Sequence, residues 1–113
     1  LLQRFPKIDA VICANDEMAL GAMEAIAAAN REKEMLLSGY DGNQDAYMSI
    51  AQGLMFATLD LNPWALAGEA VEAAIKYLDG ESVPKEIEVE LALVHSENVR
   101  DYLYKRFGYR LME

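Results

Sequence analysis

The chain has 113 residues, of which 53% are hydrophobic and 26% charged, and 19 acidic against 10 basic residues give it a formal net charge of −9. This length and composition predict one globular domain or one lobe of a larger protein, and they exclude a disordered or collagen-like chain. The negative charge argues against nucleic acid and anionic membrane surfaces as partners of this segment, because both repel it. With one cysteine, Cys13, and one histidine, His95, the chain can form neither an internal disulfide nor a Cys/His zinc site.

Strands and helices are predicted to alternate along the first 80 residues. Short apolar runs at 10–14, 35–40 and 55–59 predict buried strands. The segments 17–29, 45–52 and 63–79 predict helices, because they lack internal breakers and follow residues that favour helix starts. Gly53 is expected to end the second helix in the left-handed conformation. This order predicts an α/β fold with a parallel sheet.

The last third of the chain predicts one more strand and one more helix. Residues 86–94 alternate glutamate with aliphatic side chains at first, a pattern that is typical of a half-exposed edge strand. Ser96 is expected to cap a final amphipathic helix, in which Val99, Leu103 and Phe107 belong to the apolar stripe.

The polar residues that follow the predicted strands form the candidate site. In an open parallel sheet, ligands bind beyond the carboxyl ends of the strands, which points to residues 15–17, 41–43 and 60–62. Carboxylates and carboxamides in these places can form several hydrogen bonds with neighbouring hydroxyl groups of a polyol. The alternative is a structural role as helix caps and turns, which use the same residue types.

Five short motifs between residues 8 and 99 add a resemblance to a known family. They read A-N-D-x-M-A-x-G at 14–21, G-Y-D-G at 39–42, I-x-x-G-x-x-x-A-T at 50–58, N-P with G-x-A-V at 62–71, and L-V-x-x-E-N-V at 93–99. In this order they resemble the motifs of type 1 periplasmic sugar-binding proteins and of the related LacI-type transcription regulators.

The resemblance implies a two-lobed protein that traps a small ligand, commonly a monosaccharide, by closing a hinge. The chain would then hold part of a three-layer, flavodoxin-like parallel sheet that is incomplete by itself. Residues 1–61 are expected to form the C-terminal part of the second ligand-binding lobe. Residues 62–113 are expected to cross the hinge, to give a helix and a strand to the first lobe, and to end in a terminal helix. The remaining N-terminal part of the same protein, or a second copy, is expected to complete the fold.

Three site residues follow from the resemblance. Asn15 and Asp41 match positions that hydrogen-bond sugar hydroxyls in the ribose-binding type, and Leu61 stands where the family usually has glutamine. Since leucine cannot form that hydrogen bond, the ligand is expected to be less polar than ribose or differently oriented.

The function implied by the resemblance is that of a solute-binding component of an ABC-type sugar transporter. Such a protein delivers its ligand to a membrane permease without catalysis or a cofactor, in the periplasm or outside the cell, with or without a lipid anchor. The alternative is the effector-binding domain of a LacI-type regulator. Residues 55–60 lack the P-x-L-T-T-V stretch that is usual in such regulators, which favours transport. A signal peptide upstream would select the transport function, and a helix-turn-helix would select the regulator.

Catalytic and metal-binding functions find little support. No nucleophile, base and orienting group stand at a recognisable spacing, so we expect no enzyme, with glycoside hydrolysis by Asp16, Glu17 or Asp41 as a remote alternative. Residues 41–45 have oxygen ligands at the spacing of a calcium loop, but positions 46 and 52 lack the glycine and glutamate that an EF-hand requires. We expect Trp64 to pack against other residues rather than to stack on a sugar.

Overall fold

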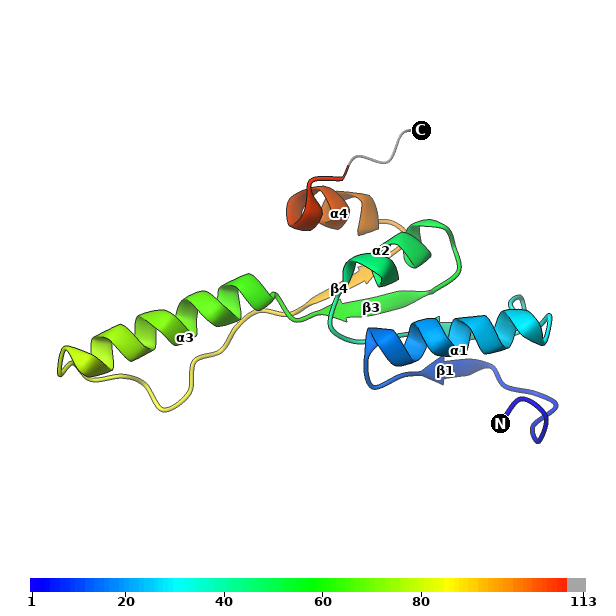
Figure 1. The fold of residues 1–113 in the computed structure, drawn as a ribbon, viewed down its shortest axis with the longest axis horizontal. Helices are drawn as coiled ribbons and strands as arrows, with labels where there is room; N and C mark the ends of the chain where they lie inside the picture. The colour runs from blue at the N-terminus through cyan, green and yellow to red at the C-terminus, as the bar shows by residue number, and fades with distance from the viewer. Residues whose placement is uncertain (110–113) are drawn as a thin grey trace.

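The computed structural model describes residues 1–109 as an alternation of strands and helices (Figure 1). The elements are β1 (Ala10–Ile12), α1 (Asp16–Ala28), β2 (Leu36–Ser38), α2 (Gln44–Ala51), β3 (Ala57–Asp60), α3 (Pro63–Leu78), β4 (Ala92–His95) and α4 (Val99–Phe107). The three strands and three helices predicted for the first 80 residues are all present, although the strands are shorter than expected. Gly53 ends α2 at a φ of 75°, which confirms the predicted left-handed stop.

The four strands form one sheet in the order β1-β2-β3-β4. Strands β1, β2 and β3 are parallel, as predicted, with Ala10 opposite Leu36 and Ser38 opposite Ala57. Each parallel pair is joined through a helix, which is the connection that parallel strands need. Strand β4 runs antiparallel to β3, and this ladder ends where Asp60 pairs with Ala92. The α/β fold class is therefore confirmed, with a mostly parallel sheet.

The predicted strand at 86–94 is wrong for most of its length, because only Ala92–His95 pairs with a neighbour. Residues 79–91 run apart from the sheet, so their alternating glutamates and aliphatic side chains lie beside no strand among residues 1–109. Alternation predicts the two faces of a strand, but hydrogen bonds to a partner create it. The final helix also begins later than expected, at Val99, with Asn98 rather than Ser96 at the N-cap position.

Helices α1, α2 and α4 contribute to one hydrophobic core with β2 and β4. Tyr47 is a fully buried member of this core, with its ring edge-on to Tyr102 and Phe107 at centroid distances of 6.2 and 5.7 Å. On the opposite side of the sheet Ile12 is 83% exposed and Leu93 58% exposed, so residues 1–109 leave that face uncovered. The core residues are Ala19, Ile26, Met35, Leu37, Ala46, Tyr47, Ile50, Met55, Val94, Val99 and Leu103.

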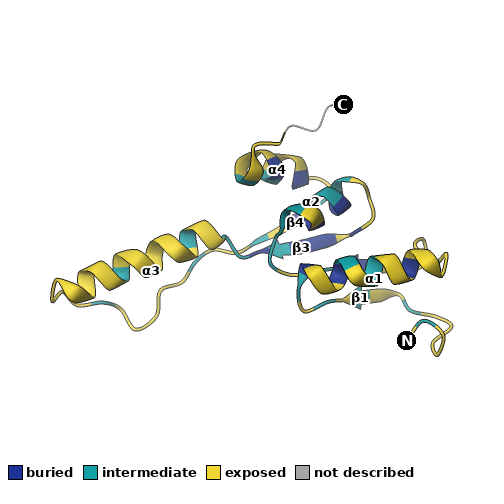
Figure 2. Cartoon of the chain, in the orientation of Figure 1, coloured by how far each residue is buried: buried dark blue, intermediate teal, exposed yellow. Residues whose placement is uncertain are grey.

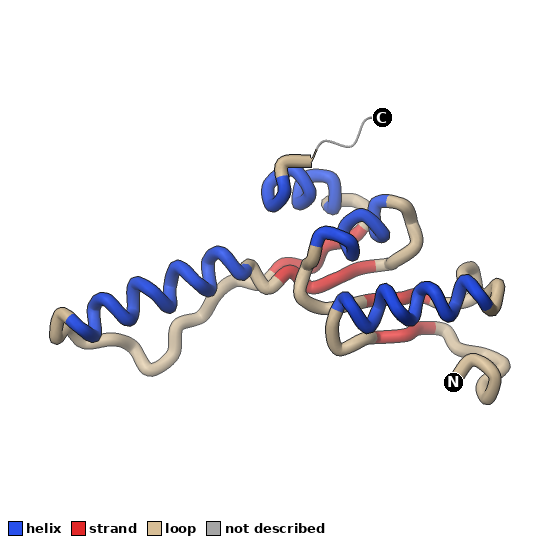
Figure 3. The backbone as a smooth tube through the Cα atoms, in the orientation of Figure 1, coloured by secondary structure: helices blue, strands red, loops and turns tan. Residues whose placement is uncertain are grey.

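Two regions can be distinguished, which we call the body (residues 1–61 and 92–109) and the arm (residues 62–91). Helix α3 and the segment after it extend away from the sheet (Figures 1 and 3). No residue of α3 is buried (Figure 2), and Trp64, which was expected to pack, is 73% exposed. The radius of gyration is 17.8 Å, whereas a compact domain of this length has about 13 Å. Among residues 1–109, no helix is both long and apolar enough to cross a membrane.

Candidate functional site

The three predicted site residues lie at the same edge of the sheet. Asn15, Asp41 and Leu61 follow the carboxyl ends of β1, β2 and β3, and main-chain hydrogen bonds join the segments that carry them. The amide of Asp16 donates to the carbonyl of Tyr40 at 2.8 Å, and the amide of Leu61 donates to the carbonyl of Asp41 at 3.3 Å. The parallel sheet thus brings together residues that are distant in the sequence, as the strand order predicts.

Asn15 caps a helix with one of its two side-chain polar groups, and the other group has no partner among residues 1–109. It occupies the N-cap position of α1, and its Oδ1 accepts a hydrogen bond from the amide of Met18 at 2.8 Å. The structural role considered from the sequence is therefore real. The side-chain NH2 of Asn15 has no hydrogen-bond partner among residues 1–109, so the same side chain retains two donors. Capping and ligand binding are compatible here.

Asp41 presents a carboxylate from a constrained backbone position. Its φ of 118° lies in a region that non-glycine residues rarely adopt, which costs on the order of 1–3 kcal/mol. Its amide donates to the carbonyl of Leu59 at 2.9 Å, and the residue forms a parallel bridge with Asp60. The carboxylate itself has no partner among the residues that the structure describes. This half-buried acceptor stands at the edge where Asn15 offers a donor.

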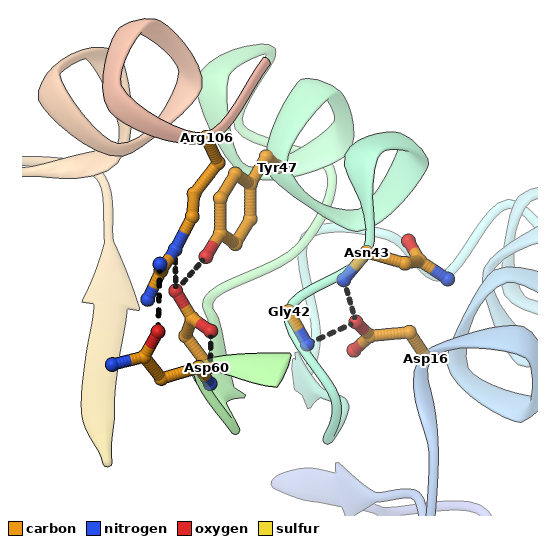
Figure 4. Close-up of polar contacts among 7 residues, drawn as sticks. Asp16, Gly42, Asn43, Tyr47, Asp60 and Arg106 are labelled. Atoms are coloured by element: carbon orange, nitrogen blue, oxygen red, sulfur yellow. Dashed lines mark hydrogen bonds and ion pairs between the residues drawn. The ribbon is translucent and has the colours of Figure 1, made fainter. Parts of the chain in front are cut away.

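Asp16 anchors the loop that follows β2 (Figure 4). Its fully buried carboxylate accepts hydrogen bonds from the amides of Gly42 at 2.9 Å and Asn43 at 2.8 Å, and from the hydroxyl of Thr58 at 2.6 Å. A β-carbon at residue 39 would collide with Asp16 Oδ1, so this position requires glycine. A single carboxylate therefore ties the start of α1 to the loop after β2 and to β3.

The loop after β2 is held at its other side as well. Gly42 has a φ of 79°, and a β-carbon there would lie 2.7 Å from the Cα of Asp60, so the backbone of the loop passes too close to β3 for any side chain. Asn43 Oδ1 caps α2 by accepting from the amide of Ala46 at 2.8 Å, and its Nδ2 donates to Glu17 Oε1 at 3.1 Å. The two glycines of the G-Y-D-G motif, on either side of Asp41, are thus explained by the close approach of the backbone to Asp16 and to Asp60.

A second buried carboxylate, Asp60, ends β3. It accepts hydrogen bonds from Tyr47 Oη at 2.7 Å, from Arg106 Nε at 2.8 Å and from the amide of Asn62 at 2.6 Å. Burial, reinforced by the hydrogen bond to Asp60, raises the pKa of Tyr47, so that its hydroxyl remains a neutral donor. Figure 4 shows Tyr47 and Arg106 converging on Asp60. We call Tyr47, Asp60, Asn62 and Arg106 the Asp60 cluster.

Leu61 lies between two members of this cluster. It is half-buried and contributes no hydrogen-bonding side chain to the edge. The next residue, Asn62, occupies the N-cap position of α3 but forms no capping bond. Its Oδ1 instead accepts a hydrogen bond from Arg106 Nη1 at 2.8 Å, and its backbone is left-handed with a φ of 49°. The side chain of this N-cap residue thus contacts α4 instead of capping its own helix.

Sequence reasoning missed the residues that hold the site in shape. Asp16 was recognised as a polar residue after a strand, but not as the anchor of the next loop. Nothing in the sequence pointed to a contact between Arg106 and Asp60, because the two residues lie 46 positions apart. The helix that carries Arg106 was predicted only from its apolar stripe. Contacts between distant segments of this kind depend on tertiary structure.

The edge places polar and apolar side chains side by side. Asn15 offers hydrogen-bond donors, Asp41 offers an acceptor, and Leu61 offers an apolar surface. Within residues 1–109, no group of three or more histidine, cysteine, aspartate or glutamate side chains is placed to hold a metal ion. Burial raises the pKa of the Cys13 thiol, which makes it less reactive as a thiolate.

Known proteins resemble this chain over most of its length. The family described as periplasmic binding protein domain matches residues 1–82. The ribose import binding protein RbsB of Bacillus subtilis (strain 168) is 45% identical over 93 residues, which are 82% of this chain and 30% of that protein.

Solved structures of solute-binding proteins also resemble this chain over most of its length. An ABC transporter periplasmic solute binding protein from Actinobacillus succinogenes 130z with bound D-allose has a TM-score of 0.86 and 34% identity, over 89% of this chain and 35% of that one. A solute binding protein from Bacillus halodurans C-125 with bound myo-inositol has a TM-score of 0.82 and 31% identity, over 88% of this chain and 34% of that one. The chain thus spans about a third of the length of the relatives that it matches.

Proposed function

The chain belongs to the periplasmic binding protein domain family, and from this premise we propose that it forms part of a protein that binds a small polyhydroxylated ligand between two hinged lobes, without catalysis. One observation carries the proposal: the residues at 15, 41 and 61 meet at the carboxyl edge of the sheet, with an amide donor and a carboxylate acceptor that have no partner among residues 1–109. Two similar proteins were solved with D-allose and myo-inositol, which are ligands of this chemical class.

The three edge residues divide the recognition of such a ligand between them. The Asn15 amide donates to a hydroxyl oxygen, and the Asp41 carboxylate accepts from one or two hydroxyl groups. Leu61 contacts a less polar part of the ligand. The preferred ligand of this protein is therefore a sugar or cyclic polyol that needs fewer hydrogen bonds at the hinge than ribose does.

The division into lobes follows the body and the arm. Residues 1–61 belong to the second lobe, the chain crosses the hinge at Leu61 and Asn62, and the arm belongs to the first lobe. The part assigned to the first lobe is thus smaller than the sequence predicted, because residues 92–109 stay with the second lobe. Strand β4 pairs with β3, and α4 packs against α2. The support for the arm as part of another lobe is that α3 is apolar along its length and has no buried residue.

Delivery to the permease of an ABC transporter, in the periplasm or outside the cell, completes the proposal. The relatives reported above are an import binding protein and transporter solute-binding proteins, which favours this function over that of a LacI-type regulator. Binding requires the opposing lobe, supplied by the remaining N-terminal part of the same protein or by a second copy.

A chimera tests the proposal. The first two thirds of the Bacillus subtilis ribose import binding protein is joined to residues 1–113, and binding of ribose, allose and myo-inositol is measured by calorimetry. We expect binding to at least one of them, and Asn15→Ala and Asp41→Ala should each weaken it by about 1.5–3 kcal/mol, because each removes a partner of a buried hydroxyl. Asp45→Ala, an exposed carboxylate of α2, is the matched control and should leave the affinity unchanged. Unchanged affinity in both site variants would contradict the site, and absence of binding in the parent chimera would contradict the function.

The role of Leu61 has its own variant. Leu61→Gln restores the hydrogen-bonding side chain that the family usually has, so the chimera should gain affinity for ribose relative to the other ligands. The 113-residue chain alone presents one wall of the site and should bind none of the panel. Micromolar binding of a sugar by the monomeric chain would contradict the two-lobed proposal.

A further inference from the structure

The arm leaves the body at a single place. The β3–β4 ladder ends at the pair formed by Asp60 and Ala92, and beyond it both segments continue into the arm. No residue of α3 is buried, so packing of α3 against the body does not set its direction. Its direction therefore depends on the two segments that join it to the ladder, and the shorter of them is the pair of residues 61 and 62.

These residues are held by one guanidinium group. Arg106 Nε donates to Asp60 Oδ2 at 2.8 Å, and its Nη1 donates to Asn62 Oδ1 at 2.8 Å. The two acceptors flank Leu61 on either side, and Asp60 Oδ1 also accepts from the amide of Asn62 at 2.6 Å. Backbone and side chain of Asn62 are thus both bound, which stabilises its left-handed backbone at a φ of 49°.

The group that holds the crossing is itself fixed to the body. Helix α4 is anchored by Val99 and Leu103, which are 1% and 0% exposed, and the ring of Phe107 packs against Tyr47. The side chain of Asp60 is 1% exposed and that of Arg106 is 21% exposed. Charged hydrogen bonds in such a buried setting are stronger and more directional than those in water.

We propose that Arg106 is the positioning residue of the crossing: it fixes the direction in which the chain leaves β3 for α3, and with it the place of Leu61 at the edge of the sheet. The planar guanidinium presents Nε and Nη1 to the two acceptors in a fixed geometry, whereas the ammonium of a lysine is a single point charge on a flexible stem. Residue 106 lies beyond the residues 1–82 that the family matches. That this crossing acts as a hinge between two lobes rests on the proposed function. The positioning of α3 by Arg106 is independent of that function.

Distances between spin labels test the proposal in the full 113-residue chain without any ligand. In a Cys13→Ala background, one label is placed on α1 by Glu24→Cys and the other on α3 by Tyr77→Cys, both at exposed positions. Double electron–electron resonance should give a narrow distance distribution in the parent. Arg106→Gln should broaden it, while Arg100→Gln, which removes an exposed arginine from the same helix, should leave it unchanged. An unchanged distribution in Arg106→Gln would overturn the proposal.

A second pair of labels separates positioning from a general loosening of α4. With labels on α1 and at Asp101→Cys, an exposed position of α4, the distribution should be the same in the parent and in Arg106→Gln. Movement of α4 in this pair would assign Arg106 a merely structural role and would overturn the proposal. Failure to bind sugar leaves both distance measurements intact, so the two proposals fail separately.

Conservative variants keep the proposal testable if Arg106→Gln does not fold. Arg106→Lys retains a cation beside Asp60 but loses the simultaneous contact with Asn62, so it should still broaden the α1–α3 distribution. Asn62→Ala removes the same contact from the other side. The double variant should broaden the distribution no further than the larger of the two single effects, because both changes break one interaction. Additive broadening, or a parent-like distribution in Arg106→Lys, would overturn the proposal.

Discussion

Helices α2 and α3 are both rich in apolar residues, but only α2 buries them. In the body, Ala46, Tyr47 and Ile50 of α2 are 0–1% exposed, whereas in the arm Val71 and Ile75 of α3 are 60% and 54% exposed. Helix formation depends on local sequence, while burial depends on a second surface that lies opposite. The comparison teaches that the apolar side chains of α3 lack a surface to pack against, because the rest of residues 1–109 does not supply one.

The two regions also use ion pairs differently. In the body, Asp60 and Arg106 form a largely buried pair at 2.8 Å that holds the chain crossing. In the arm, Lys76 Nζ lies 2.6 Å from Glu72 Oε1, and its hydrogen bond lowers the pKa of that exposed carboxyl. Exposed pairs of this kind are screened by water and salt and contribute little to stability. Only the buried pair can determine a geometry.

The largest expected difference between body and arm is the cost of removing the same side chain. Ile50→Ala, in the core, should lower the free energy of unfolding by about 2–5 kcal/mol, because it leaves a cavity. Ile75→Ala, at an exposed position of α3, should change it by less than about 0.5 kcal/mol. Urea unfolding followed by circular dichroism measures both. Equal losses would mean that α3 is packed in solution, for example against a second copy. If Ile50→Ala does not fold, Ile50→Val can be compared with Ile75→Val, and the expected loss of unfolding free energy in the core is then smaller.

A second comparison uses two glycines. Gly39→Ala should destabilise the body by about 1–3 kcal/mol, because the new methyl group must displace the Asp16 carboxylate that anchors the loop after β2. Gly68→Ala, inside α3, meets no atom within 4 Å and should increase the helix content of the arm, since alanine is the better helix former by about 1 kcal/mol. Unfolding free energies and helix content are measured on the same samples. A harmless Gly39→Ala would contradict the close approach of the loop to Asp16.

The smallest effect concerns pH and sharpens the contrast between buried and exposed tyrosines. Since the folded state raises the pKa of Tyr47, the unfolded state ionises first, and stability is lost as the pH rises above about 10. The slope attributable to Tyr47 should approach about 1.4 kcal/mol per pH unit. Tyr47→Phe should remove it, and Tyr77→Phe on the exposed arm should not. The measurement is unfolding free energy at several pH values above 9 in the three proteins. Equal alkaline slopes in the parent and Tyr47→Phe would show that Tyr47 does not carry the effect.

Much of the candidate site could be predicted because it follows from strand order. Once β1, β2 and β3 are recognised as parallel, Asn15, Asp41 and Leu61 must follow strand ends at one edge, and the structure confirms this placement. Contact of these residues with a ligand remains a prediction. What could not be predicted is how the edge is held: Asp16 reaches a loop 26 positions away, and Arg106 reaches Asp60 from another helix.

The sequence by itself determined the helices, the apolar strands and the motifs, because these depend on neighbours along the chain and on the periodicity of burial. It did not determine which segments would find a partner. Residues 86–91 alternate like an edge strand and Trp64 has the character of a packing residue, yet both belong to the exposed arm. Pairing and burial are properties of two surfaces that meet, and only the tertiary structure decides which surfaces do so. The same reason makes Arg106, rather than any residue near Leu61 in the sequence, the group that holds the crossing.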